Sequence, residues 1–206
     1  MAFSLFSMKA RASNEESFWK WFVANEARLF AIERHQEAVF DELGKEMSRV
    51  NSDLTFEFGP IKNGKREFVI SAGGIKSAFP AVEALYSKAP ILPRWSWVKY
   101  RPRRLPLSDI EFGGRSVKAK DVRYLLAKDG GKVGIVLFFN GYRDAEKNVF
   151  GQIGYLFLDE ALGEHAVETQ VGFIEFQSPD SKYYLQSRPL TELPTQFDEY
   201  FGHKVH

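Results

Sequence analysis

The chain has 206 residues, of which 44% are hydrophobic and 15% aromatic, enough to fill a substantial core and too many for a long disordered segment. Its 28 basic and 27 acidic residues leave a net charge of +1, which disfavours a dedicated nucleic-acid or polyanion binder. Cysteine is absent, which excludes disulfides and thiolate metal sites and favours a cytoplasmic location.

A membrane-spanning segment is not expected. The N-terminal stretch Met1–Met8 is apolar, but it is too short for a signal peptide or a membrane span. Later stretches do not approach about 18 unbroken apolar residues, the length that a spanning helix needs. We therefore expect a cytoplasmic protein without a membrane partner.

Helices are predicted over the N-terminal residues 1–53. Ser13 and Glu16 form a capping box, in which each side chain satisfies a backbone amide of the first helical turn. Apolar residues then recur at helical spacing on both sides of Glu33–Gln36, where the phase of the stripe drifts. This pattern predicts two helices, or one helix that bends there. The stripe consists of Phe18, Trp19, Phe22, Leu29, Ile32, Val39, Phe40, Leu43, Met47 and Val50.

A strand–strand–helix–strand unit (ββαβ) is predicted over residues 54–104. Alternation from Leu54 to Phe58 indicates the first strand, and Asn63-Gly64 is typical of a type I′ hairpin turn into the second, residues 67–72. Pro80 suits the first turn of the helix that follows. The third strand, Trp95–Tyr100, places both of its tryptophans on one face, because side chains alternate along a strand.

A second unit with the same order is predicted over residues 121–177, after a connection at 105–120 that can hold a short hairpin at 110–117. Asp129-Gly130 joins the first two strands of this unit. We expect Asp144 to cap its helix and Gly163 to end it, with the last strand at Val167–Phe176. Residues 178–206 are predicted as a C-terminal tail with a short helix at 196–201.

Together these elements predict an α+β fold. The N-terminal helices come first, and the two ββαβ units then form one mostly antiparallel sheet with helices over one face. We expect a single domain spanning residues 1–206, because neither unit alone has enough helix to cover its sheet.

Two groups of acidic residues are candidates for chemistry. Glu26 and Glu33 lie near the apolar stripe of the N-terminal helices, where two carboxylates can act as acid and base or can pair with nearby arginines. Glu160, Glu164 and His165 lie at the end of the second-unit helix without the order of a metalloenzyme motif, so a solvated helix end is predicted there.

Neither a metal site nor a cofactor is expected. Zinc sites on helices use closely spaced histidines, and the histidines His35, His165, His203 and His206 do not have that spacing. A nucleophilic serine elbow is also absent from the sequence. The composition of the chain therefore favours a binding protein over an enzyme.

The segment Arg94–Arg104 combines five basic residues with three aromatic ones and contains no acid. Interleaved cations and aromatics suit an acidic protein surface or single-stranded nucleic acid. The alternative is that the tryptophans fill the core while the cations form a solvated strand end. The candidate binding residues are Trp95, Trp97, Lys99, Arg101, Arg103 and Arg104.

Three further segments carry a resemblance. The helix Phe18–Phe22 with Asn25, the stretch Phe79–Val82 and the helix end Leu158–Glu164 resemble small bacterial proteins that open with a tryptophan- and phenylalanine-rich helix. The resemblance spans nearly the whole chain, but its motifs are structural. It implies no activity and transfers no functional residue.

The favoured hypothesis is a non-catalytic bacterial protein that binds another protein as an accessory, immunity-like or regulatory partner. One alternative is a hydrolase that uses carboxylates such as Glu26 and Glu33. A second alternative is an RNA-associated factor that uses the segment Arg94–Arg104, which the even charge balance disfavours.

Overall fold

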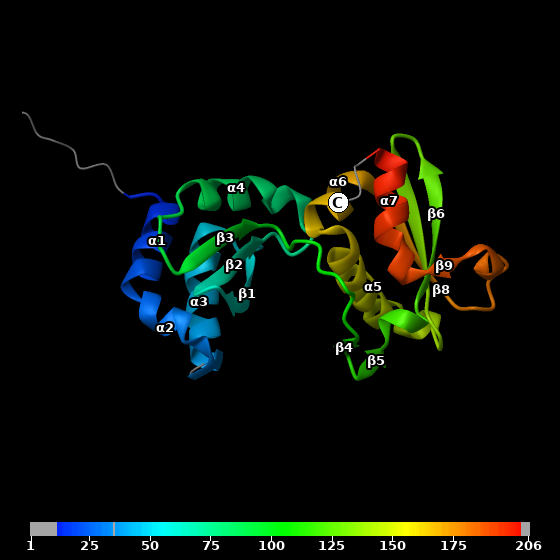
Figure 1. Ribbon diagram of the computed structural model, residues 1–206, viewed down its shortest axis with the longest axis horizontal. Helices are drawn as coiled ribbons and strands as arrows, with labels where there is room; N and C mark the ends of the chain where they lie inside the picture. The colour runs from blue at the N-terminus through cyan, green and yellow to red at the C-terminus, as the bar shows by residue number, and fades with distance from the viewer. Residues whose placement is uncertain (1–11, 35, 203–206) are drawn as a thin grey trace, which may run out of the picture. The chain divides into compact units, whose positions relative to one another are not determined.

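The computed structural model describes residues 12–34 and 36–202, which belong to two compact units, Met1–Lys99 and Tyr100–His206 (Figure 1). The stretch Met1–Met8 and the histidines at 35, 203 and 206 lie outside the described residues. The predicted α+β class with N-terminal helices and mostly antiparallel sheets is confirmed. Within the described ranges, no helix is long and apolar enough to cross a membrane.

The first unit begins with a group of helices in place of the two expected. The capping box is confirmed, since the Glu16 amide donates to Ser13 Oγ at 3.3 Å and the Ser13 amide donates to Glu16 Oε2 at 3.2 Å. The chain breaks its helical path at Asn25 and again at residues 31–34, close to the predicted drift. The helices are α1 (Asn14–Ala24), α2 (Glu26–Phe30), a 3-10 turn (Ile32–Arg34) and α3 (Gln36–Val50).

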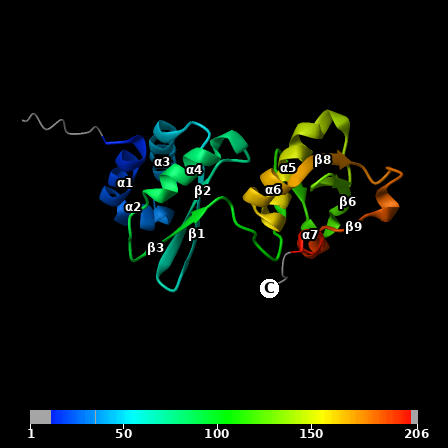
Figure 2. The ribbon, with the colours of Figure 1, turned by 90° about the horizontal axis from the view of Figure 1, so that it is seen from above.

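The predicted ββαβ order is confirmed in the first unit. Strand β1 (Thr55–Lys62) pairs antiparallel with β2 (Lys65–Ser71), and helix α4 (Phe79–Ser87) leads back to β3 (Trp95–Lys99), which pairs parallel with β2. A 3-10 turn, Lys76–Ala78, precedes α4. Figure 2 shows the helices of this unit on one side of its three strands. Phe22, Phe68 and Trp95 meet between the two layers, with ring centroids 4.9–6.5 Å apart.

The second unit also has the ββαβ order. Strands β6 (Arg123–Asp129) and β7 (Lys132–Phe138) form an antiparallel hairpin, and β8 (Val171–Gln177) returns parallel to β7. A small hairpin, β4 (Ile110–Phe112) and β5 (Arg115–Val117), precedes them as predicted. The core lies between the sheet and helix α5 (Lys147–Leu162) and includes Ile135, Leu137, Phe150 and Phe157. The 3-10 turns of the unit are Ala119–Asp121, Asp144–Glu146, Tyr184–Gln186 and Leu190–Glu192.

The expectation of one continuous sheet is wrong. The described strands form a three-stranded sheet β1-β2-β3, a two-stranded hairpin β4-β5 and a four-stranded sheet β8-β7-β6-β9. Strand β3 ends at Lys99, and the next residue, Tyr100, has a φ of 61°, so the chain leaves the extended conformation there. Each ββαβ unit therefore carries its own core, whereas the sequence reasoning assumed that each needed the other.

The segments around β8 also differ from prediction. Gly163 ends α5 with a φ of 85°, as expected, but a short helix α6 (Glu164–Gln170) follows it, so that β8 begins at Val171. Asp144 does not cap α5, because the chain makes a 3-10 turn at Asp144–Glu146 before the helix begins at Lys147. The expected start of the last strand at Val167 is therefore wrong, because Val167 lies in α6 and is buried in the core of this unit.

The predicted C-terminal tail is part of the second core. Strand β9 (Arg188–Pro189) pairs antiparallel with β6, and helix α7 (Leu193–Phe201) buries Leu193 and Phe197. The tail was underestimated because β9 is only 2 residues long and prolines interrupt the pattern around it.

Candidate functional site

The predicted binding residues are divided between the two compact units. Trp95, Trp97 and Lys99 belong to the first unit, whereas Arg101, Arg103 and Arg104 belong to the second. Trp95 is 4% exposed and its indole N–H donates to Glu26 at 2.9 Å, while the Trp97 indole N–H donates to the Pro90 carbonyl at 2.7 Å. Both indoles are therefore engaged within the first unit.

Lys99 and Arg103 have carboxylate partners within their own units. Lys99 Nζ lies 2.8 Å from a Glu83 carboxylate oxygen. Arg103 donates two hydrogen bonds to Asp198, at 2.7 and 2.9 Å, a geometry that a planar guanidinium makes well. The backbone amide of Arg104 donates to the Glu160 carbonyl at 2.8 Å. Much of the positive charge of the segment is thus neutralised locally.

A buried acidic cluster surrounds Arg101. Its guanidinium lies 3.2 Å from Asp159, and its backbone amide donates to Glu164 at 2.9 Å. Glu164 is 0% exposed, so the prediction of a solvated helix end is wrong at this residue. The pKa of Asp159 is raised to about 6, chiefly because burial penalises the charged form; Arg101 opposes this shift and the neighbouring Glu164 carboxylate adds to it. His165, next in the chain, is exposed, with its ring 5.1 Å from that of Tyr100.

The carboxylates of the hydrolase hypothesis are both in ion pairs. Glu26 contacts Arg94 at 2.6 Å and accepts the Trp95 indole N–H, and these bonds outweigh partial burial, so its pKa is lowered. Glu33 pairs with Arg66, whose hydrogen bond lowers the pKa of Glu33. Each carboxylate is matched to its own arginine and held in the charged form. This arrangement fits a structural role.

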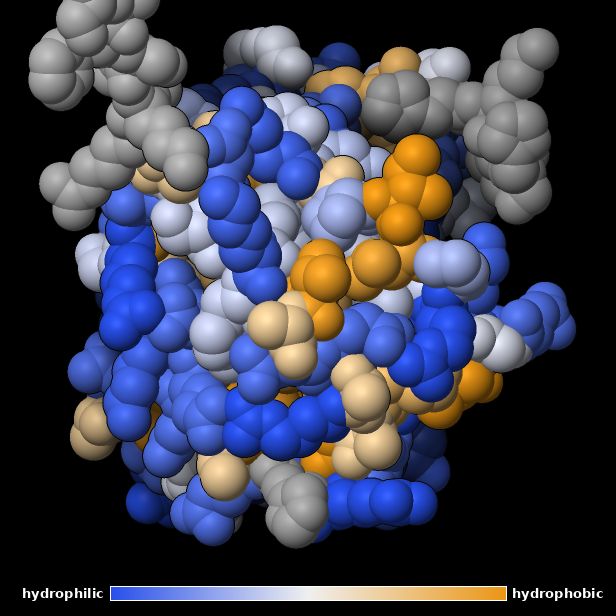
Figure 3. Space-filling view, turned by 90° about the vertical axis from the view of Figure 1, so that its left-hand side faces the viewer, coloured by the Kyte–Doolittle hydropathy of each residue, from blue (hydrophilic) through white to orange (hydrophobic). Residues whose placement is uncertain are grey.

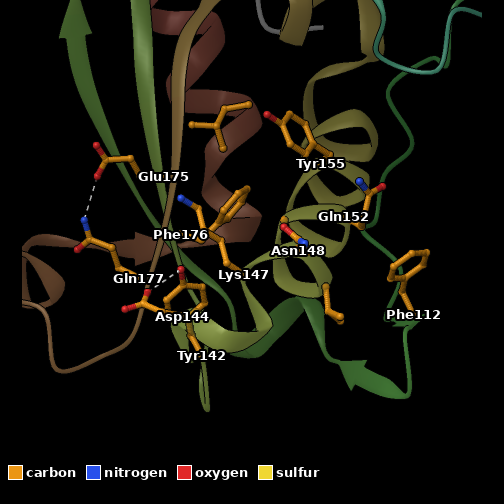
Figure 4. A pocket seen from close by; sticks show the side chains of 13 residues that line it. Phe112, Tyr142, Asp144, Lys147, Asn148, Gln152, Tyr155, Glu175, Phe176 and Gln177 are labelled. Carbon is orange, nitrogen blue, oxygen red and sulfur yellow. Dashed lines mark hydrogen bonds between the residues drawn. The ribbon is translucent and has the colours of Figure 1, made fainter.

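The second unit contains an open groove beside α5. It has a volume of about 870 Å³ and runs between the N-terminal half of α5 and strand β8 (Figure 4). We call it the α5–β8 groove; its lining residues are Phe112, Tyr142, Asp144, Lys147, Asn148, Val149, Gly151, Gln152, Tyr155, Ile174, Glu175, Phe176 and Gln177. A shallower hollow continues from it past the end of β8 toward Ser178–Ser181.

The walls of the groove combine aromatic and amide side chains. Phe112 and Tyr155 are each 43% exposed, and the ring of Tyr155 lies edge-on to that of Phe176 at a centroid distance of 6.1 Å. Asn148 and Gln152 are exposed on the same helical stripe as Tyr155, because residues spaced by four and three positions share one face. The carboxylates in the lining are Asp144, which accepts from the Tyr142 hydroxyl at 3.3 Å, and Glu175.

The ionisable side chains that line this groove are Asp144, Lys147 and Glu175, together with the tyrosines Tyr142 and Tyr155. Its lining includes no histidine and no serine, and its Asp144 and Lys147 carry opposite charges. Across residues 12–34 and 36–202, no group of three or more histidine, aspartate or glutamate side chains could hold a metal ion. A concave surface with exposed aromatics and uncommitted amides is the usual form of a recognition site.

Sequence reasoning missed the groove because its walls come from segments far apart in the chain. The spacing of Asn148, Gln152 and Tyr155 on one helical face is a signal that the sequence contains, but the strand beside them, β8, begins four residues later than predicted. On the first unit, Figure 3 shows a short run of hydrophobic side chains amid a mostly hydrophilic surface.

Comparison with known proteins finds no match among family models, curated proteins or solved structures. The resemblance expected from the N-terminal helix and the helix end at Leu158–Glu164 is therefore not supported by a match. The case for function depends on the geometry of the chain itself.

Proposed function

We propose that this chain is a non-catalytic protein-binding module of bacterial type that acts in the cytoplasm as an accessory, immunity-like or regulatory partner. Its binding site is the α5–β8 groove. The observation that carries the proposal is the exposure of Phe112 and Tyr155 at the mouth of a groove of about 870 Å³. Exposed aromatics that a fold leaves beside a concavity are typical anchors for a protein partner.

The charge distribution supports a protein partner over RNA. Lys99, Arg101 and Arg103 each contact a carboxylate of this chain, and a polyanion would have to displace those contacts. The role of Trp95, Trp97, Lys99, Arg101, Arg103 and Arg104 in binding stays a prediction. Retention of the protein on a polyanion column, measured at rising salt, separates the two functions. If the chain binds RNA, the triple variant Arg101→Ala, Arg103→Ala and Arg104→Ala should lose this retention. If it binds a protein in the groove, no such loss is required.

Selection against displayed peptides tests the proposal directly. The full chain is immobilised, a random peptide library is selected on it, and the enriched peptides are titrated in solution. We expect them to lose at least tenfold in affinity on a Gln152→Arg and Tyr155→Asp double variant, whose new charges lie on the groove wall. Tyr200→Asp is the matched control, because Tyr200 is 39% exposed on α7 and does not line the groove.

Peptides that bind both variants alike would locate recognition elsewhere and overturn the groove as the site. Failure to enrich any groove-dependent peptide would overturn the proposed function itself. Circular dichroism of each variant shows whether it keeps the fold, so that a loss of binding is not mistaken for unfolding.

A further inference from the structure

The outer edge of β8 offers unpaired backbone groups to the α5–β8 groove. Strand β8 is the end strand of its sheet and pairs only with β7 among the described strands. The Phe139 amide donates to the Gln177 carbonyl at 3.0 Å, which fixes the direction of the Gln177 peptide groups toward β7. The direction of the backbone N–H and C=O groups alternates along a strand. Those of Phe173 and Glu175 therefore also point toward β7, whereas those of Ile174 and Phe176 point away from it.

The two edge strands of this sheet, β8 and β9, differ in length and in proline content. At the other edge, β9 is only 2 residues long and ends in Pro189, which cannot donate a backbone hydrogen bond. Short strands and prolines are the usual means by which proteins block an edge. Strand β8 has 7 residues and no proline, so that its outer edge remains available.

The two faces of β8 present different chemistry to a strand laid beside it. Ile174 and Phe176 share the face that packs toward α5, and Phe176 lies on the glycines of that helix. Glu175 lies on the opposite face, and Figure 4 shows its side chain directed away from α5 toward Gln177. The side-chain amide of Gln177 donates to the Glu175 carboxylate at 3.0 Å, and no cation within the described ranges pairs with this carboxylate.

We propose that the α5–β8 groove binds an extended peptide segment of a partner protein as an added strand on β8, and that this segment alternates apolar and basic residues. This inference rests on the proposed function and names its ligand. The apolar side chains enter the groove beside Tyr155 and Phe112. The basic side chain lies directly opposite Glu175, because cross-strand neighbours point to the same face.

The charges and amides of the groove favour a peptide over a polyanion. Asp144 and Lys147 cancel in charge, so the wall by α5 offers no net attraction to a polyanion. The exposed amides of Asn148 and Gln152 can donate and accept, which suits the peptide groups of an extended chain. Glu175 supplies a carboxylate on the far face that pairs with no cation within the described ranges, and it therefore favours a cation opposite it.

The test uses short synthetic peptides, blocked at both ends, in which valine and lysine alternate. They are titrated against the full chain, together with counterparts in which glutamate replaces lysine. We expect the lysine form to bind about fivefold more tightly, the effect of one favourable cross-strand ion pair exchanged for a repulsive one. A Glu175→Lys variant should reverse this preference, whereas Glu199→Lys, which makes the same charge change on α7, should not.

Backbone methylation tests strand addition separately from side-chain preference. One peptide carries N-methyl groups on its valines and another on its lysines. Only one edge of an added strand bonds to β8, so we expect one methylated form to lose at least tenfold in affinity and the other to retain it. Loss in the valine form indicates antiparallel addition and loss in the lysine form indicates parallel addition.

Amide hydrogen exchange supplies an independent readout on the protein. Peptide binding should protect the amides of Ile174 and Phe176, whereas those of Phe173 and Glu175 are already bonded to β7 and serve as internal controls. Equal binding of both methylated forms, or unchanged exchange at Ile174 and Phe176, would overturn strand addition. If selected peptides still depend on Tyr155 in that case, the proposed function stands and this inference alone fails; if none does, both fail.

Discussion

The ring of Phe176 lies directly on Gly154, so closely that a Cβ at position 154 would come within 2.2 Å of the Phe176 Cε1 atom. Gly151, on the preceding turn of α5, would place a Cβ 3.6 Å from the same ring. The two glycines therefore allow β8 to approach the helix at this point. The position of the Phe176 ring, which lines the α5–β8 groove beside Gly151, therefore depends on these glycines.

Alanine at position 154 should destabilise the second unit. The ring of Phe176 must move or tilt to accept the new methyl group, and such overpacking costs about 1–3 kcal/mol. Urea denaturation measures the free energy of unfolding. Gly44→Ala is the control, because a Cβ there has no heavy atom within 4 Å and alanine in place of helical glycine gains about 0.5–1 kcal/mol. Equal stabilisation by both substitutions would contradict the contact.

The pair Arg103 and Asp198 should contribute more to stability than a surface ion pair. It makes two hydrogen bonds, its side chains are 30% and 12% exposed, and the bond to Asp198 raises the pKa of Arg103. We expect Arg103→Ala to cost about 2 kcal/mol, in the range of hydrogen bonds to charged groups. Arg188→Ala should cost close to nothing, since its pair with Glu192 is 3.8 Å long and more than half exposed. Similar costs for the two variants would refute the distinction.

Asp159 should make the stability of the chain depend on pH. Its folded pKa of about 6 exceeds its ordinary value of 3.8, because burial penalises the charged form. The folded state therefore binds a proton that the unfolded state does not hold between these values, and stability from this group is present at low pH and lost as the pH rises through about 6.

The matching measurement compares the wild type with Asp159→Asn at pH 5 and pH 7. The wild type should gain about 1 kcal/mol relative to the variant as the pH falls across that interval. Carboxylates whose pKa is lowered, such as Glu26 and Glu33, titrate below this window and affect both proteins alike. A constant difference between the two proteins would mean that Asp159 is not shifted.

Local chemistry made much of the fold predictable. Asn63-Gly64 and Gly163 adopt positive φ, as a hairpin turn and a helix end require, and the Ser13 capping box forms as expected. The division into separate sheets was not predictable in this way, because it depends on how much core each unit closes. The positive φ of Tyr100 has no sequence signal, since it is an aromatic residue in a conformation that glycine prefers.

The candidate site was harder to predict than the fold. The cations of Arg94–Arg104 lack acidic neighbours within the segment, but Glu83, Asp159 and Asp198 reach them from distant segments. Conversely, Asn148 and Tyr155 form a groove wall because β8, an edge strand, lies beside them. Neither relationship is encoded in local spacing, because both arise from tertiary contacts.

The role of Glu33 can be settled by a double substitution. The side chain of Arg66 is only 4% exposed and its Nε has no hydrogen-bond partner, so its charge depends on the Glu33 carboxylate. We expect Glu33→Ala to lower the urea midpoint, because it leaves a guanidinium uncompensated in the interior. Adding Arg66→Met should restore the midpoint to wild type or above it, since methionine fills the space without a charge. A structural pair behaves in this way; if the double variant stayed as unstable as Glu33→Ala, Glu33 would have another role.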